Sequence, residues 1–182
     1  IIREVLQPKD KVAITQPRRV AVRSVSRYVA KRINSSIGNE VGYQIRFEDV
    51  TTKGTKINFM TDGILLRKIQ EDPLLKEYSA VIIDEAHERS LNIDFTLGLL
   101  KKAQKEREER NLPYLKVIVS SATIEKEKFA QYFENAPITE IPGRLYPVKI
   151  HYEKEPVLDY CEKAAEKVEE ILKDPKRKEG DI

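Results

Sequence analysis

The stretch Ala-Val-Ile-Ile-Asp-Glu-Ala-His at residues 80–87 decides the fold, because it joins an uninterrupted apolar run to two acidic residues. Four apolar residues without polar alternation are typical of a strand that is buried on both faces of a parallel sheet. In open α/β sheets, ligands bind in the crevice outside the carboxyl ends of such strands. The stretch therefore predicts an α/β fold with a ligand site that begins at Asp84.

Further short apolar runs alternate with helical patterns along the chain, at residues 12–15, 57–60, 117–119 and 138–141. Between them, apolar residues at helical spacing predict helices over residues 18–33, 62–71, 92–110 and 125–134, and Pro73 ends the second of these. Alternating strands and helices imply βαβ units around a parallel sheet. The run at 117–119 also lacks polar alternation, so we expect it to be buried on both faces.

The last forty residues read as a separate segment. Residues 142–147, Pro-Gly-Arg-Leu-Tyr-Pro, have the composition of a linker. A strand-like stretch at 148–152 follows, and then a helix that we expect to begin at Pro156, a favourable first-turn position. We therefore divide the chain into an α/β domain at 1–142 and a linker with the start of a second domain at 143–182. The chain begins without Met and closes on strand-like residues, which favours a fragment.

Composition excludes some classes of protein. No apolar run approaches the roughly 18 residues of a membrane helix, and no signal-peptide pattern opens the chain. The single cysteine, Cys161, cannot form an internal disulfide and fits a reducing compartment. We expect a soluble intracellular protein, cytoplasmic or nuclear, without a membrane partner. The net charge of +3 is too small to indicate a nucleic-acid partner by itself.

The acidic pair suits nucleotide chemistry. A strand-end Asp such as Asp84 holds the Mg²⁺ of a bound nucleotide in many α/β proteins, and the next carboxylate, Glu85, can orient or deprotonate the attacking water. An acidic strand end before an ordinary loop explains a bare Asp-Glu pair equally well. Ser121 and Thr123 follow the next strand, where their hydroxyls can lie close to His87. Thr123 also suits the N-cap of the helix after it, and the two roles are compatible.

A basic stretch precedes these motifs: residues 11–39 contain seven Lys or Arg and no Asp or Glu. Arg19, Arg23, Arg27 and Lys31 recur every four residues on a predicted helix, where like charges repel each other and an anionic partner would be favourable. A solvated basic face is the alternative. Arg18 and Arg19 lie where strand becomes helix, so their side chains and the first helical amides can converge on one phosphate.

Two more places suit contact with a phosphate backbone. Thr61, Asp62 and Gly63 follow a strand and open a helix, so a hydroxyl, free amides and a glycine that permits close approach occur together. A capped helix start is the alternative there. Arg46 lies in a polar turn, where it is either a surface arginine or a nucleic-acid contact. His151, by contrast, has no chemically useful neighbours in the sequence.

Taken together, these motifs resemble the DEAH-box RNA helicases of superfamily 2. Asp-Glu-Ala-His-Glu-Arg-Ser at 84–90 and Ser-Ala-Thr at 121–123 carry the resemblance. Residues 15–21, 42–48, 61–63 and 142–148 resemble the first RNA-contact motif, the hook-shaped turn, the second RNA motif and the linker to the second RecA-like domain. The resemblance implies a RecA-like parallel sheet flanked by helices, of the P-loop NTPase type, with the helicase ATP-binding domain at 1–142.

The resemblance also implies roles. Asp84 would hold Mg²⁺ through water, Glu85 would activate the hydrolytic water of ATP or another NTP, and His87 would link nucleotide state to Ser121 and Thr123. Backbone contacts to RNA, without sequence specificity, would come from Arg18, Arg19, Arg46, Thr61, Asp62 and Gly63. Where many relatives place a nucleobase-stacking arginine this chain has Tyr28, which stacks without the cationic component; Arg27 is the alternative.

One element of the family pattern does not occur. No G-x-x-x-x-G-K-[ST] is present, so we expect the chain to be truncated before the phosphate loop and to hydrolyse little ATP alone. The whole protein would be a 3′-to-5′ ATP-dependent RNA helicase that couples hydrolysis to translocation on single-stranded RNA and to RNA or RNP remodelling, with a possible protein activator. The alternatives are a non-enzymatic RNA-binding scaffold of the same fold and a DNA helicase.

Overall fold

The computed structural model describes residues 11–122, 126–141, 143, 148, 150–152 and 156–173. The chain divides into two compact units, Ile1–Thr139 and Glu140–Ile182. The predicted boundary between residues 142 and 143, and the assignment of the second unit to a second RecA-like domain, stay predictions.

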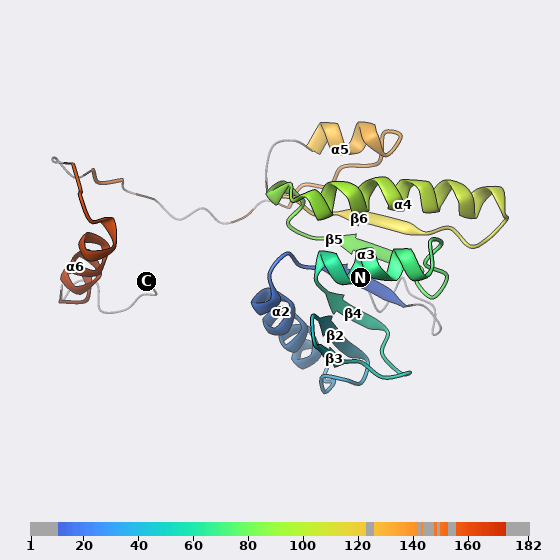
Figure 1. Cartoon of the computed structure of the whole chain (residues 1–182), viewed down its shortest axis with the longest axis horizontal. Helices are drawn as coiled ribbons and strands as arrows, with labels where there is room; N and C mark the ends of the chain where they lie inside the picture. The colour runs from blue at the N-terminus through green and yellow to red at the C-terminus, as the bar shows by residue number, and fades with distance from the viewer. Residues whose placement is uncertain are drawn as a thin grey trace. The chain divides into compact units, whose positions relative to one another are not determined.

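The first unit is built on a six-stranded sheet with the order β3-β2-β4-β1-β5-β6 (Figure 1). All neighbouring strands are parallel except β2 and β3, which form an antiparallel hairpin. The strands are β1 Val12–Thr15, β2 Val41–Ile45, β3 Glu48–Val50, β4 Ile57–Met60, β5 Ala80–Ile83 and β6 Lys116–Val119. The predicted α/β fold with a parallel, RecA-like sheet is confirmed, and three of the predicted strands have the bounds of β1, β4 and β5.

Helices cover both faces of this sheet. One face packs against α3 Asp62–Glu71 and α4 Leu91–Glu109 through buried residues such as Leu65 and Leu100. The other face packs against α2 Arg19–Arg32 through Val22 and Ala30. Strand β1 supplies Ala13 to the first core and its neighbours to the second, as the alternation of side chains along a strand requires. A short helix, α5 Lys126–Tyr132, follows β6.

Two strand predictions are wrong. Residues 138–141 form no strand, and Ile141 is 89% exposed. Strand β6 is not buried on both faces: its residues alternate between exposed and half-buried, and Ile118 is 52% exposed. The reason is position, because β6 is the last strand of the described sheet and pairs with β5 alone within it. An apolar run shows strand character, while burial depends on what lies on each side of the strand.

The hairpin of β2 and β3 was not predicted as strands, since residues 42–48 were expected to form a turn. The turn itself is confined to Arg46 and Phe47, because Ile45 pairs with Glu48 across it. Gly42 is required by the close approach of the two strands: a Cβ there would lie 2.5 Å from the carbonyl oxygen of Val50.

The second unit contains one described helix, α6 Tyr160–Lys173. It begins four residues after the predicted start at Pro156, because a carboxylate caps it. Oδ1 of Asp159 accepts hydrogen bonds from the amides of Cys161 (2.9 Å) and Glu162 (3.0 Å). Residues 148 and 150–152 are not in a strand, so the strand predicted there is not formed by them. The predicted linker at 142–147 lies outside the described residues, apart from Gly143.

Within the described part of the chain, no helix is both long enough and apolar enough to cross a membrane.

Candidate functional site

The predicted site residues are brought together by the register of the parallel strands. Thr15 of β1 lies beside Met60 of β4 on one side and Ile83 of β5 on the other, and Ile83 lies beside Val119 of β6. The residues that follow these four positions therefore emerge at one edge of the sheet. They are Gln16, Thr61, Asp84 and Ser120. This edge is the crevice in which open α/β sheets bind their ligands.

Asp84 is held in place by both of its carboxylate oxygens. Oδ2 accepts a hydrogen bond from Nε2 of Gln16, and Oδ1 accepts one from the amide of Glu85 at 3.0 Å. Gln16 is itself 5% exposed, and its main-chain N–H donates a hydrogen bond to the carbonyl of Met60 at 2.9 Å. The sequence reasoning missed Gln16, although it follows β1 as Asp84 follows β5, and that equivalence could have indicated it.

Glu85 adopts a backbone conformation that few residues with side chains adopt. Its φ is 54° and its ψ is 38°, in the left-handed region, which costs an L-residue roughly 1–2 kcal/mol. The conformation turns the chain from β5 into the short η1 turn, Ala86–Glu88. The amide of Ala86 then donates to the carbonyl of Ser120 at 3.0 Å, so the turn is tied to the end of β6. Strain of this kind at a strand end is typical of functional sites.

His87 lies between Glu85 and the segment after β6. Its Nδ1 accepts a hydrogen bond from the amide of Ala122 at 3.2 Å and lies 3.4 Å from Oε2 of Glu85. One nitrogen cannot accept from an amide and donate to a carboxylate at the same time. The contact with Ala122 therefore belongs to a neutral imidazole with its proton on Nε2, and the contact with Glu85 belongs to a ring protonated on Nδ1. His87 can thus exchange partners without moving far.

The predicted partners of His87 are placed unequally. Ser121 adjoins Ala122, and so lies beside the His87 contact in the chain. Thr123 lies outside the described residues. A main-chain amide, that of Ala122, makes a described link between His87 and this segment. The predicted roles of Ser121 and Thr123 toward His87 stay predictions.

At the edge of the sheet, where a metal was predicted, hydrogen bonds hold both carboxylate oxygens of Asp84. No group of three or more His, Cys, Asp or Glu side chains arranged to hold a metal is found in the described ranges. Asp84 nevertheless fits Mg²⁺, because this ion takes oxygen ligands and usually keeps several waters beside one or two carboxylates and the substrate phosphates. Binding of Mg²⁺ by Asp84 through water stays a prediction.

Arg18 and Arg19 begin α2 at the same edge. Nη2 of Arg18 lies 3.2 Å from Oε1 of Glu88, and the Arg18 side chain is 77% exposed. Arg19 is also exposed. The ion pair places one predicted nucleic-acid contact directly against the η1 turn that follows Asp84 and Glu85. At this exposure the pair contributes little to stability, so a phosphate can replace Glu88 at low cost.

The start of α3 is less exposed than the sequence suggested. Thr61 makes no side-chain cap hydrogen bond, so the alternative of a helix start capped by this residue is not formed. A Cβ at Gly63 would meet nothing within 4 Å, so the fold itself leaves open space there. Asp62 is only 6% exposed. Any contact that it makes with a ligand at the surface has to come from its amide, not from its carboxylate.

The buried carboxyl of Asp62 has an altered acidity. Burial raises its pKa, the nearby Thr15 hydroxyl opposes that rise, and the negative charge of Glu88 adds to it. Its Oδ1 is without a hydrogen-bond partner among the described residues. Asp62 is therefore an interior carboxyl directly beneath the predicted site.

One of the basic side chains of α2, Arg23, is bonded to a carboxylate of the neighbouring hairpin. Arg23 donates to Oε2 of Glu48 on β3 from both Nε (3.1 Å) and Nη2. Tyr43 of β2 donates its hydroxyl hydrogen to Oε1 of the same carboxylate. Tyr43 and Arg23 lower the pKa of Glu48, and the charge of Arg27 contributes in the same direction. Tyr28, the predicted nucleobase contact, is 63% exposed.

Arg46 occupies the turn of the β2–β3 hairpin. Its guanidinium carbon lies 4.8 Å from the centroid of the Phe47 ring, a cation–π contact. Phe47 is 92% exposed and has a φ of 68°.

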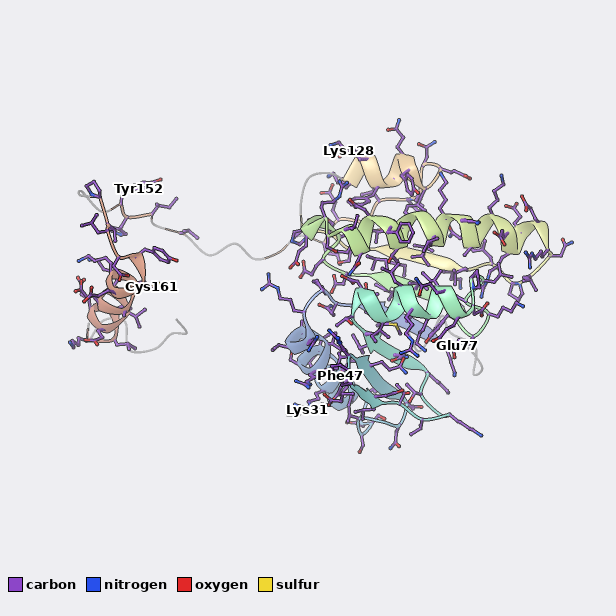
Figure 2. The ribbon with its side chains drawn as sticks, in the orientation of Figure 1. Lys31, Phe47, Glu77, Lys128, Tyr152 and Cys161 are labelled. Atoms are coloured by element: carbon purple, nitrogen blue, oxygen red, sulfur yellow. The ribbon has the colours of Figure 1, made fainter. Side chains whose placement is uncertain are left out.

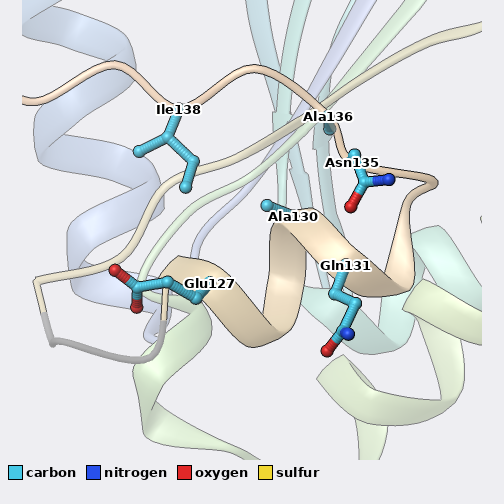
Figure 3. Close-up of a pocket in the computed structure, with 6 residues that line it drawn as sticks. All are labelled: Glu127, Ala130, Gln131, Asn135, Ala136 and Ile138. Atoms are coloured by element: carbon cyan, nitrogen blue, oxygen red, sulfur yellow. The ribbon is translucent and has the colours of Figure 1, made fainter.

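An open hollow also occurs beside α5, lined by Glu127, Ala130, Gln131, Asn135, Ala136 and Ile138 (Figure 3). None of the predicted site residues lines it. His151 is exposed, in agreement with its interpretation as an ordinary surface residue.

Comparison with known proteins shows that the chain is similar to helicases. The family model described as DEAD/DEAH box helicase matches residues 1–131. The ATP-dependent RNA helicase HrpA of Borreliella burgdorferi is 48% identical over 174 residues, which are 94% of this chain and 20% of the relative. The ATP-dependent RNA helicase DHX33 of Drosophila melanogaster is 51% identical over 149 residues, 82% of this chain and 21% of the relative. The chain thus spans about a fifth of the length of these curated relatives.

Proposed function

The chain belongs to the DEAD/DEAH-box helicases, and from this premise we propose that the protein is an ATP-dependent RNA helicase of the DEAH type. It couples nucleotide hydrolysis to movement along single-stranded RNA and to the remodelling of RNA or RNP. One observation carries the proposal. Asp84 and Glu85 follow the buried strand β5 directly, and His87 beside them is bonded to the segment after β6.

The residues at the sheet edge have separate roles in hydrolysis. Asp84, oriented by Gln16, would hold Mg²⁺ through water. The ion would supply positive charge beside the phosphates of ATP. Glu85 orients the attacking water and accepts its proton. His87 can respond to that change, because its Nδ1 lies within reach of Glu85 and of the Ala122 amide.

RNA is bound at the same edge, on the side of α2, the β2–β3 hairpin and α3. The exposed Arg18, Arg19 and Arg46 provide positive charge, while Thr61 and the free amides before Gly63 provide hydrogen-bond donors to phosphate. Such contacts read the backbone and not the bases. Tyr28, exposed on α2, remains available for stacking on the nucleobase of ATP, and Arg27 is the alternative.

The test of the enzymatic role is Glu85→Gln in the whole protein. We expect RNA-stimulated ATP hydrolysis to be abolished while nucleotide binding persists, because the amide keeps the shape of the side chain but cannot accept the proton. Glu109→Gln, at the far end of α4, is the matched control and should leave turnover unchanged. Retained hydrolysis in Glu85→Gln would remove the proposed role of Glu85.

Measurements on the unaltered protein distinguish the proposed helicase from a non-enzymatic RNA-binding scaffold. A scaffold binds single-stranded RNA without hydrolysing ATP in response to it, whereas the proposed helicase does both. The chain of 182 residues alone is expected to show negligible ATPase activity, since no phosphate-cradling loop with its lysine occurs in it.

The RNA contact is tested by Arg19→Ala. We expect the affinity for unrelated single-stranded RNA sequences to fall by about the same factor in each case, as for a lost phosphate contact. A loss that depends strongly on the RNA sequence would contradict a backbone contact.

A further inference from the structure

Glu48 joins two elements that the proposed function assigns to RNA binding. Helix α2 begins with Arg19, and the β2–β3 hairpin turns at Arg46 and Phe47. Glu48 is the first residue of β3, directly after that turn. Its carboxylate is bonded to Arg23 of α2 and to Tyr43 of β2. Figure 2 labels Phe47 in the hairpin turn and Lys31 near the end of α2.

Both oxygens of this carboxylate are engaged. Oε2 takes the two donors of Arg23, and Oε1 takes the hydroxyl of Tyr43. Tyr43 is 2% exposed, whereas the side chains of Arg23 and Glu48 are 43% and 33% exposed. One end of the network is thus fixed in the core, and the other end reaches the surface of the helix. Charge-assisted bonds to both oxygens leave the carboxylate little freedom to rotate.

The residues of the turn beside Glu48 give it little stability beyond the exposed cation–π contact between Arg46 and Phe47. Phe47 has a φ of 68°, a conformation that is an outlier for a bulky residue. Its ring is 92% exposed, so it adds almost nothing to the core. Because Ile45 and Glu48 form the last pair before the turn, the anchoring of Glu48 determines where Arg46 is presented.

The charge of Glu48 is unfavourable for RNA binding if it is considered alone. A carboxylate among cations opposes the approach of a polyanion, and Arg27 of α2 is close enough to interact with it electrostatically. A position that served only to attract RNA would not carry an acid. We propose that Glu48 is a positioning residue that ties α2 to the β2–β3 hairpin, so that Arg19 and Arg46 meet the same RNA strand at a fixed separation. This inference rests on the proposed function. Arg23 serves as the partner of Glu48 in it, and not as an RNA contact.

The decisive experiment measures the affinity of the whole protein for a fluorescent single-stranded oligoribonucleotide, with Glu48→Ala as the variant. Charge alone predicts tighter binding, since a negative group is removed. Positioning predicts binding weaker by about fivefold, within the range that coupling in one hydrogen-bond network produces. Glu71→Ala is the matched control, because it removes a carboxylate paired with an arginine at the far end of α3. It should leave the affinity unchanged.

Tyr43→Phe gives a second measurement without any change of charge. Removing the hydroxyl frees one oxygen of Glu48, and the affinity should fall by about two- to threefold. The thermal unfolding midpoint is recorded for each protein. If Glu48→Ala does not fold, Tyr43→Phe decides.

The outcomes separate the inference from the function on which it rests. Weaker binding by Glu48→Ala and Tyr43→Phe, with unchanged unfolding midpoints, supports positioning. Equal or tighter binding by both variants overturns it, even where the unaltered protein binds RNA and hydrolyses ATP in response. If the unaltered protein does neither, the proposed function itself fails and the inference fails with it.

Discussion

Replacing Arg107 by Ala should lower the free energy of unfolding by about 4 kcal/mol. Arg107 lies in α4 and is only 3% exposed. Its Nε donates to the carbonyl of Leu74 at 2.8 Å, and its Nη2 donates to those of Leu75 (2.6 Å) and Tyr78 (2.9 Å). Its Nη1 donates to the carbonyl of Pro113 at 3.2 Å. One side chain therefore fastens the loop between α3 and β5 to the end of α4.

The magnitude follows from the acceptors that Ala leaves behind. Three of the four hydrogen bonds are buried, and an orphaned buried carbonyl costs about 1–3 kcal/mol. The lower end of this range applies to each carbonyl, because water can enter part of the space that the guanidinium vacates and can hydrogen-bond to the carbonyl. Three such costs of about 1 kcal/mol, with about 1 kcal/mol for the lost packing of the aliphatic stem, give the value above.

Arg107→Lys separates geometry from charge. Burial lowers the pKa of the Arg107 guanidinium and the charge of Asp72 opposes that shift, so the site accepts a cation at some cost. A lysine keeps the charge and the stem, but its compact ammonium cannot match the planar fork that spans four carbonyls. We expect a loss of about 2 kcal/mol, half that of Ala.

Urea unfolding, followed by circular dichroism, measures both variants. With a slope of about 2 kcal/mol per molar urea, a loss of 4 kcal/mol moves the midpoint down by about 2 M. Arg110→Ala is the matched control, since this exposed arginine of the same helix end pairs with Glu106 at 3.2 Å and should change stability by less than about 0.5 kcal/mol. A loss below about 1 kcal/mol for Arg107→Ala would refute the reasoning, because the four hydrogen bonds would then have no net value.

Three further changes have defined results. Gln16→Leu should lower the RNA-stimulated kcat of the whole protein by about ten- to a hundredfold with less effect on KM for ATP, since Asp84 loses its orienting donor; an unchanged kcat in steady-state assays would contradict this. Burial raises the pKa of the Tyr78 hydroxyl well above its ordinary value, so the stability that its neutral form contributes is present below that ordinary value and is lost as the pH rises above it. The drop in urea midpoint between about pH 8 and about pH 11 should therefore be smaller in Tyr78→Phe. Gly42→Ala should destabilise the first unit by about 1–3 kcal/mol, because its Cβ would lie 2.5 Å from the Val50 carbonyl oxygen; an unchanged thermal midpoint would show that β3 moves away freely.

The local features of the fold were predictable because each depends on a short stretch of chain. The strands at residues 12–15, 57–60 and 80–83 are short stretches made mostly of apolar residues, and the structure reproduces their bounds. Helix α3 has its predicted bounds, ending before Pro73. In contrast, the β2–β3 hairpin was missed, although Val41, Tyr43 and Ile45 alternate with polar or small residues as a half-buried strand does.

The burial of an element could not be read from its sequence with the same success. Residues 80–83 and 117–119 have the same apolar character, yet β5 is interior and β6 is an edge of the described sheet. The start of α6 was placed four residues early, because Pro156 is a common first-turn residue while the actual cap is Asp159. In both cases the outcome depended on the contacts that the element makes with its surroundings, and not on its own composition.

The sequence by itself determined the fold class, the family and the position of the two carboxylates at a strand end, because these depend on periodicity and on contiguous motifs. Only the tertiary structure decided which side chains hold those groups. Gln16 reaches Asp84 across 68 residues, and Arg23 reaches Glu48 across 25. Asp62 also became an interior carboxyl instead of a surface one. Such contacts depend on strand order and register, which bring distant residues to the same edge and which no local pattern encodes.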